Sequence, residues 1–223
     1  MNAALLQALR DLEADLAPLT HNTAVLERIK AFAEIIGAKS HQRQPVLNLS
    51  GVLLQPPITL TDAFMRGYAA ESDAFNVLQG DVITTQSAYF MGERLTGERR
   101  FVVLTPSCDL VSGRREHASL LSMSAITATT DKAKELLSSL TAFRRSDAMY
   151  LPPLEADLER GILGFAVSFD GVCNIGNAEI QTATRLASAS LVGWRVYCAM
   201  LQSVLTRAGT DEIALRRSFT TLV

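Results

Sequence analysis

The chain has 223 residues, of which 48% are hydrophobic and 20% are charged. These proportions are typical of a folded globular protein and exclude an intrinsically disordered chain. The formal net charge of −2 excludes the strongly basic balance of many nucleic-acid-binding domains, so a basic surface could only be local. Four Arg-Arg pairs supply material for such a surface, at positions 99–100, 114–115, 144–145 and 216–217.

The cysteine pattern and the first residues narrow the class of protein further. Cys108, Cys173 and Cys198 are far apart and form no CxxC pair, which is against a disulfide framework and against a zinc site. We therefore expect no metal and no other cofactor, and a cytoplasmic location. The first residues lack the basic start and apolar run of a signal peptide, and no stretch reaches the ~18 uncharged apolar residues of a membrane span. We expect no membrane association.

Residues 1–40 predict a helical hairpin. Leucines recur at spacings of three and four between residues 3 and 16, and a second apolar stripe covers residues 23–36, just before Gly37 in the position of a helix C-cap. Residues 41–78 predict a loop-rich connection that contains one helix. An amphipathic hairpin of this kind is a packing element or a partner-binding element.

Residues 79–187 predict a β-rich core. Three segments rich in β-branched and apolar residues follow one another, separated by short polar turns: GDVITTQSAYF, RFVVLT and ASLLSMSAI. Together they predict an antiparallel meander of three strands. Residues 131–145 then predict a helix, AMYLPPL an extended segment, and GILGFAVSFDGVCNI one or two strands with a turn at Asp170-Gly171.

Residues 188–223 predict C-terminal helices, the first of them long and apolar. Trp194, Tyr197, Met200 and Leu201 follow helical spacing, which favours core packing for Trp194, with a partner groove as the alternative. The fold class predicted from the residues is therefore α+β, with helices at both ends around a small, mainly antiparallel β core.

A cluster of reactive residue types follows the RFVVLT strand. One interpretation is a thiol site, with Cys108 as nucleophile, His117 as base and Arg114 or Arg115 lowering the pKa of the thiol. The structural interpretation makes Cys108 a small buried hydrophobe and Asp109 a turn residue that accepts backbone N–H bonds. We favour the structural interpretation, in which the turn presents the arginines. The spacing of Cys108, Asp109 and His117 matches no recognised metal site.

The run QGDVI...GERRFVVLTPSCDLVSGRREHASLLSMSAI resembles the small barrels of the MazF/PemK-like family. The likeness covers residues 80–126, where a Gly-Asp strand start, an Arg-rich loop, a VVLT strand, a polar turn and a strand with a late Ser occur in the family's order. It implies an SH3-like barrel and metal-independent cleavage of single-stranded RNA. Arg100 would stabilise charge on the scissile phosphate, and Ser124 would assist.

In the same comparison, Arg99, Arg114 and Arg115 would contact the nucleic-acid backbone. The chain departs from the family in having Phe101 where the toxins usually have proline, and in its flanking helical segments. A second likeness, in VVLTPSCDL, YLPPL, FDGVCNI and the apolar C-terminal helix, is to uncharacterised bacterial proteins associated with mobile-element and phage-defence loci. It implies a setting rather than a chemistry.

Three functional hypotheses follow. The first is an interaction subunit of a bacterial conflict system, phage-defence or toxin-antitoxin-like, that binds a protein encoded nearby, with RNA or DNA as a further partner and homo-oligomers left open. The second is the endoribonuclease that uses Arg100 and Ser124. The third is a hydrolase that uses Cys108 with His117. Whether the chain is an enzyme stays open at this point.

Overall fold

The computed structural model describes residues 27–28, 31, 49–67, 76–205, 214–216 and 218. Most of the predicted N-terminal hairpin, and most of the predicted C-terminal helices beyond residue 205, lie outside these residues. The few described positions within them are helical, and Glu27, Arg28 and Ala31 are exposed.

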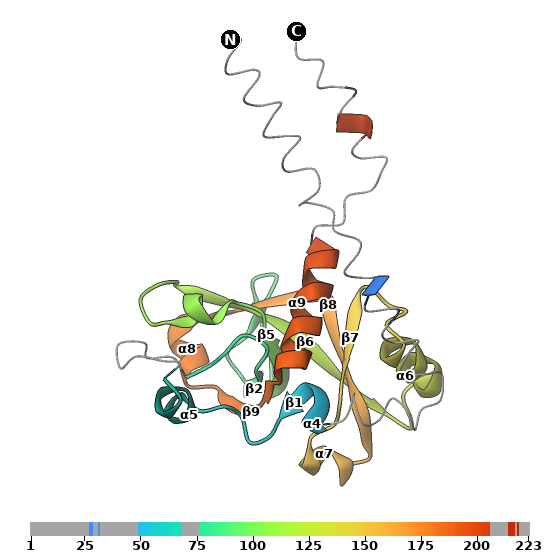
Figure 1. Cartoon of the computed structure of the whole chain (residues 1–223), viewed down its shortest axis with the longest axis horizontal. Coiled ribbons are helices and arrows are strands. Elements are labelled where there is room, and N and C mark those ends of the chain that lie inside the picture. The colour runs from blue at the N-terminus through green and yellow to red at the C-terminus, as the bar shows by residue number, and fades with distance from the viewer. Residues whose placement is uncertain are drawn as a thin grey trace.

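Nine strands occur in the described residues and form one open antiparallel sheet in the order β1-β9-β2-β5-β6-β8-β3-β4, with β7 added beside β8 (Figure 1). The strands are β1 (Leu53–Leu54), β2 (Val82–Thr85), β3 (Tyr89–Phe90), β4 (Glu93–Arg94), β5 (Arg99–Val103), β6 (His117–Thr127), β7 (Ala148–Leu151), β8 (Ile162–Gly176) and β9 (Thr184–Ala189). The sheet curls like part of a barrel but does not close.

Six α-helices and one 3-10 turn accompany the sheet in the described part of the chain, so the α+β class is confirmed. They are α4 (Leu49–Val52), α5 (Leu60–Met65), the turn η1 (Ser107–Leu110), α6 (Ala133–Thr141), α7 (Glu155–Leu158), α8 (Asn177–Gln181) and α9 (Leu191–Leu205).

The predicted meander is present as β2, β5 and β6, which lie side by side in that order. Phe101 of β5 is paired with Ser122 of β6, and Val102 with Val82 of β2. The GILGFAVSFDGVCNI segment forms the single long strand β8. The turn predicted at Asp170-Gly171 is wrong, because these residues belong to an irregular part of β8 where its register against β6 shifts. A strand can absorb extra residues as a bulge and continue.

Alternation along β5 sends side chains to two cores. Phe101 and Val103 point into a core within the curl of the sheet, together with Leu110 and Ile175. Val102 points to the opposite face, where a second core collects residues of β6, β7 and β8. The two faces of β5 therefore have different surroundings, and this decides where its arginines go.

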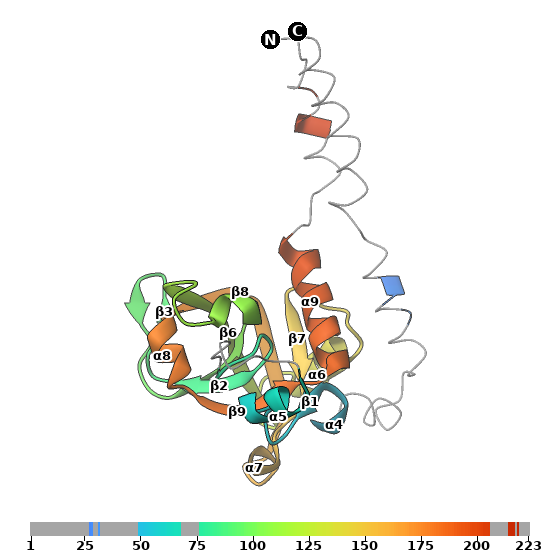
Figure 2. The same ribbon diagram turned by 60° about the vertical axis from the view of Figure 1, so that its left-hand side comes forward.

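Helix α9 covers the second core. Tyr197, Met200 and Leu201 are buried there, and the N-terminal end of α9 lies beside α4 in both views (Figures 1 and 2). The first turn of α9 is so close to α4 that a Cβ on Gly193 would lie 2.1 Å from the carbonyl oxygen of Val52. A glycine is therefore required where the two helices meet.

A buried polar network joins β2 to β9. The carboxylate of Asp81 accepts hydrogen bonds from Arg185 Nε at 2.7 Å, Ser188 Oγ at 2.6 Å and the Leu78 backbone at 2.7 Å. Burial raises the pKa of Asp81, and the Arg185 guanidinium and the three hydrogen bonds oppose that rise. The Gly-Asp pair at the start of β2 thus has a structural role in holding the sheet together.

Candidate functional site

The loop between β5 and β6 carries half of the predicted site residues, and its first part is anchored to the sheet. Leu110, the last residue of η1, is fully buried in the core of the curled sheet. Ser107 Oγ accepts a hydrogen bond from the Gln79 backbone at 2.9 Å. On the opposite side, Thr105 Oγ1 accepts one from the Ser119 backbone at 2.7 Å.

Helix α8 fastens the second part of the loop. Asn177 donates from its side chain to the Arg115 carbonyl at 3.1 Å and from its backbone to the Glu116 carbonyl at 2.9 Å. Gln181 Nε2 donates to the Leu110 carbonyl at 3.0 Å. These bonds satisfy loop carbonyls that regular structure leaves unpaired, so the second part of the loop is anchored to α8.

The side chains of the loop face outward. Arg114 donates to the Cys108 carbonyl at 2.9 Å, and Arg115 forms an ion pair with Asp109 at 2.9 Å. Both guanidinium groups are largely exposed. Asp109 thus orders the loop through this ion pair, and the loop offers two arginines to an approaching ligand.

The prediction that Cys108 is buried is wrong, because its side chain is exposed. In η1 the spacing of three residues brings Ser107 and Leu110 to the inner side, and Cys108 between them points away. His117 is exposed at the first position of β6, opposite Gly176. Across the described residues, no hydrogen bond joins Cys108 to His117, so the structure does not assemble the predicted nucleophile and base.

Arg100 is engaged inside the protein. Its NH1 lies 2.5 Å from Asp157 Oδ2, and the Asp157 side chain has no exposed surface. The same oxygen accepts a hydrogen bond from the Leu154 backbone, and the guanidinium lies over the Phe165 ring, 5.1 Å from its centre. Only 21% of the Arg100 side chain is exposed, which is against the open rim that the ribonuclease hypothesis requires.

Arg100 and Ser124 lie on opposite faces of the sheet. Phe101, next to Arg100, is paired with Ser122, so Ser122 and Ser124 share the face of Phe101. Arg99 also lies on that face, is exposed, and donates from Nε to the Thr96 carbonyl at 3.3 Å. Ser124 is exposed opposite Ala166 of β8. The predicted phosphate-binding arginine and its helper hydroxyl are not brought together.

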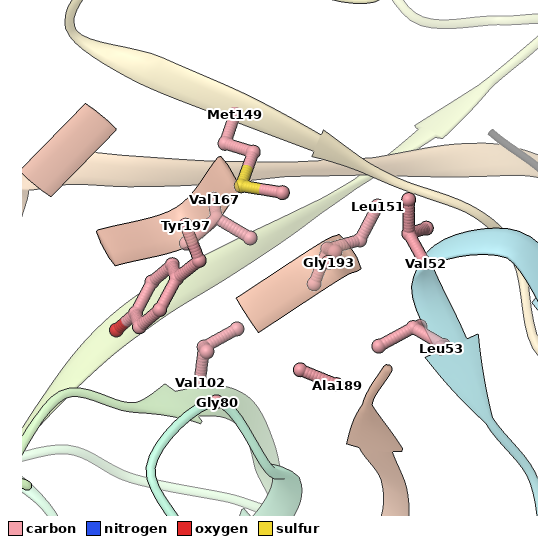
Figure 3. Close-up of a pocket in the computed structure, with 10 residues that line it drawn as sticks. All are labelled: Val52, Leu53, Gly80, Val102, Met149, Leu151, Val167, Ala189, Gly193 and Tyr197. Carbon is pink, nitrogen blue, oxygen red and sulfur yellow. The ribbon is translucent and has the colours of Figure 1, made fainter. Parts of the chain in front are cut away.

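The cavity beneath α9 has no ligand chemistry. It encloses about 10 Å³, roughly the volume that one water needs, and its ten lining residues are almost all apolar (Figure 3). Its one side-chain hydroxyl, that of Tyr197, donates to the Val103 carbonyl at 3.2 Å. Burial raises the pKa of Tyr197 above the ordinary value of a phenol. The cavity is a packing imperfection.

The outer side of α9 is apolar in part. Exposed apolar residues lie at both ends of the helix, and the prediction that Trp194 is in the core is wrong, since 40% of it is exposed. The indole lies at the flank of the helix because its N–H donates to Gln79 Oε1 at 3.0 Å. We call the exposed set the α9 surface; its members are Leu191, Val192, Trp194 and Leu205.

Several residues that shape these sites were not predicted. Gln79, Asn177 and Gln181 hold the loop, and Asp157 holds Arg100. Each is a single polar residue in an ordinary segment, so the sequence contains no signal for them. Within the described residues, no cluster of His, Cys, Asp or Glu could hold a metal ion, and no helix there has the length and apolarity to cross a bilayer.

No protein-family model matches this chain, and neither does any curated protein. Among solved structures, the chain is similar to one in the crystal structure of MazE-MazF (Form-II) from Deinococcus radiodurans. The identity is 15%, and the TM-score is 0.36 over 60% of this chain and 100% of that one. A TM-score this low carries no inference about function, which has to come from the side chains themselves.

Proposed function

We propose that the chain is an interaction subunit that binds a partner protein through the α9 surface and performs no catalysis with the predicted residues. One observation carries the proposal. Helix α9 buries one side in the core while Leu191, Val192 and Leu205 keep 66%, 50% and 71% of their surface exposed on the other. Large apolar side chains that stay exposed at both ends of one helix favour an interaction surface along it.

The partner that fits is an amphipathic helix of a second protein. A helix of 15 residues presents a ridge about 22 Å long, which matches helix-on-helix packing better than it matches a small ligand. Trp194 and the exposed Arg195 are residue types that often dominate binding energy. A protein encoded beside this chain, in a conflict system of the kind the sequence resembles, is the partner we propose.

The positions of the two residues predicted for RNA cleavage favour a protein-binding function over a ribonuclease. Arg100 is neutralised by Asp157, and Ser124 lies on the other face of the sheet. Incubation of the purified chain with mixed-sequence single-stranded RNA should therefore give no cleavage. Cleavage that is lost in Arg100→Ala, at a temperature where the variant is folded, would instead establish the ribonuclease.

The test of the proposal is binding to the purified products of the adjacent genes. Leu191→Glu should weaken such a complex at least tenfold, because a carboxylate is placed in an apolar contact. Leu158→Glu is the matched control, since Leu158 is 63% exposed and belongs to α7, which lies away from α9 (Figure 1). Equal affinities of the two variants, or a chain that binds none of the neighbouring products, would contradict the proposal.

The arginine loop supports a second candidate function, contact with a nucleic-acid backbone. Arg114 and Arg115 are exposed on a loop that α8 anchors through hydrogen bonds, which lowers the cost of ordering the loop on binding. Fluorescence anisotropy with a single-stranded RNA should then show binding that weakens steeply with salt and is reduced in Arg114→Ala. Binding that is absent at low salt, or unchanged in that variant, would remove this candidate.

A further inference from the structure

Gln79 lies between α9 and the arginine loop and bonds to both. Its Oε1 accepts from the Trp194 indole N–H at 3.0 Å and faces Cys198 Sγ at 3.7 Å. Its Nε2 donates to the Leu104 carbonyl at 2.9 Å, and its backbone N–H donates to Ser107 Oγ at 2.9 Å. One residue therefore connects a helix, the end of β5 and the start of η1.

The geometry of an amide makes this connection stiff. Oxygen and nitrogen of the Gln79 side chain lie in one plane, and both ends are occupied, so the side chain cannot follow α9 without losing the Leu104 carbonyl. The indole also lies beside Gly80, since a Cβ on that residue would be in van der Waals contact with Trp194 Cδ1, at 3.6 Å. A shift of α9 would therefore also displace residues 79–80.

The turn that Gln79 holds positions the arginines. Ser107 begins η1, whose Asp109 pairs with Arg115 and whose Cys108 carbonyl binds Arg114. Two other clamps are described on this loop: the hydrogen bond from the Ser119 backbone to Thr105 Oγ1, and α8, which lies apart from α9 in both views (Figures 1 and 2). Helix α9 also donates from Tyr197 to the Val103 carbonyl at the end of β5. Gln79, however, bonds both to α9 and to η1, so it connects α9 directly to the turn that positions the arginines.

We infer that Gln79 couples the seating of α9 to the conformation of the arginine loop, so that a partner on Trp194 changes how the loop presents Arg114 and Arg115. The part played by a partner rests on the proposed function. The coupling itself is a property of the free chain, and it acts in both directions because linkage between two sites is reciprocal.

Hydrogen exchange in the free, full-length chain tests the coupling. Trp194→Phe keeps a ring on α9 but removes the N–H that binds Gln79, and should speed exchange in residues 104–112 about fivefold, the effect of one hydrogen bond. Ser203→Ala is the control, because that hydroxyl bonds within α9 to the Met200 carbonyl. Unchanged exchange in Trp194→Phe, or equal changes in both variants, would overturn the coupling.

Fluorescence tests the reverse direction, since Trp194 is the one tryptophan of the sequence. Ser107→Ala should increase quenching of Trp194 by acrylamide, whereas Gln181→Leu, which loosens the loop from α8, should not. Quenching that rises equally in both variants would show general loosening and overturn the coupling. A chain that shows the coupling but binds no partner would contradict the proposed function alone.

Discussion

Arg100 and Arg115 each form an ion pair with an aspartate, in two different parts of the molecule. The Arg100 pair is mostly buried, whereas the Arg115 pair is exposed. Asp157 has no exposed surface and takes most of Arg100 out of solvent. Asp109 and Arg115 remain 29% and 62% exposed on the loop. A buried ion pair resists separation because either charge alone is costly inside the protein, whereas an exposed pair exchanges readily with water.

The difference follows from backbone geometry rather than from the residue type. Arg100 lies on a strand whose alternation directs it toward the core under α9, while Arg99, its neighbour, points to the other face and is exposed. Arg115 lies in the part of the loop between β5 and β6 whose side chains face solvent. A cluster of arginines in a sequence can therefore divide between structural and binding roles, and the face of each strand decides the division.

The largest expected effect comes from removing the buried partner. Arg100→Ala should lower the free energy of unfolding by about 3–5 kcal/mol, because Asp157 is left as an uncompensated buried charge. Urea denaturation followed by circular dichroism measures the change. Arg99→Ala is the matched control and should stay within about 0.5 kcal/mol of the wild type.

A double variant sharpens this comparison. Arg100→Met with Asp157→Leu removes both charges, so it should recover most of the stability that Arg100→Ala loses. If Arg100→Ala is as stable as Arg99→Ala, the Arg100 pair behaves like a surface pair, and Arg100 becomes available for the ligand contacts predicted from the sequence.

Local patterns predicted much of this fold. The meander, the helix α6 and the long helix α9 could be predicted, because each is encoded by the spacing of apolar residues that are near one another in the sequence. Strand β9 and helix α8 were not, since β9 pairs with β1 and β2 from far along the chain and α8 has only five residues. Sequence patterns do not contain such distant pairings.

The site was less predictable than the fold. The arginines of the loop were identified, but Asp157, 57 residues from Arg100, was not. Cys108 was predicted to be buried because free cysteine commonly is, and the 3-10 turn overrode that preference. The roles predicted for Arg100 and Ser124 came from a resemblance, which does not say on which face of a strand a residue lies.

Removal of the Tyr197 hydroxyl should have an effect between those of the Arg100 and Arg115 substitutions, because this group is buried and polar but uncharged. Tyr197→Phe removes the hydrogen bond to the Val103 carbonyl and should cost about 1 kcal/mol. Burial raises the pKa of Tyr197, so the phenol stays protonated in the folded state when the unfolded chain begins to lose its proton near pH 10. Its contribution is complete below about pH 10 and is lost as the pH rises further.

Denaturation at several alkaline pH values tests the Tyr197 prediction. Above about pH 10 the stability of the wild type should fall more steeply than that of Tyr197→Phe, because one fewer proton is released on unfolding of the variant. Parallel pH profiles of the two proteins would show that the Tyr197 phenol is not held protonated by the fold.

The smallest effect is expected at the surface pair. Arg115→Ala should change the free energy of unfolding by less than about 0.5 kcal/mol, because the ion pair with Asp109 is exposed and the Arg115 backbone stays bound to Asn177. High salt should reduce even this difference, whereas it should leave the effect of Arg100→Ala nearly unchanged. Thermal denaturation of both variants measures this difference at about 0.05 M salt, where screening is weak, and at about 1 M salt, where it is strong. A loss in Arg115→Ala as large as that in Arg100→Ala would mean that the loop is part of the stable core rather than a surface that presents its arginines.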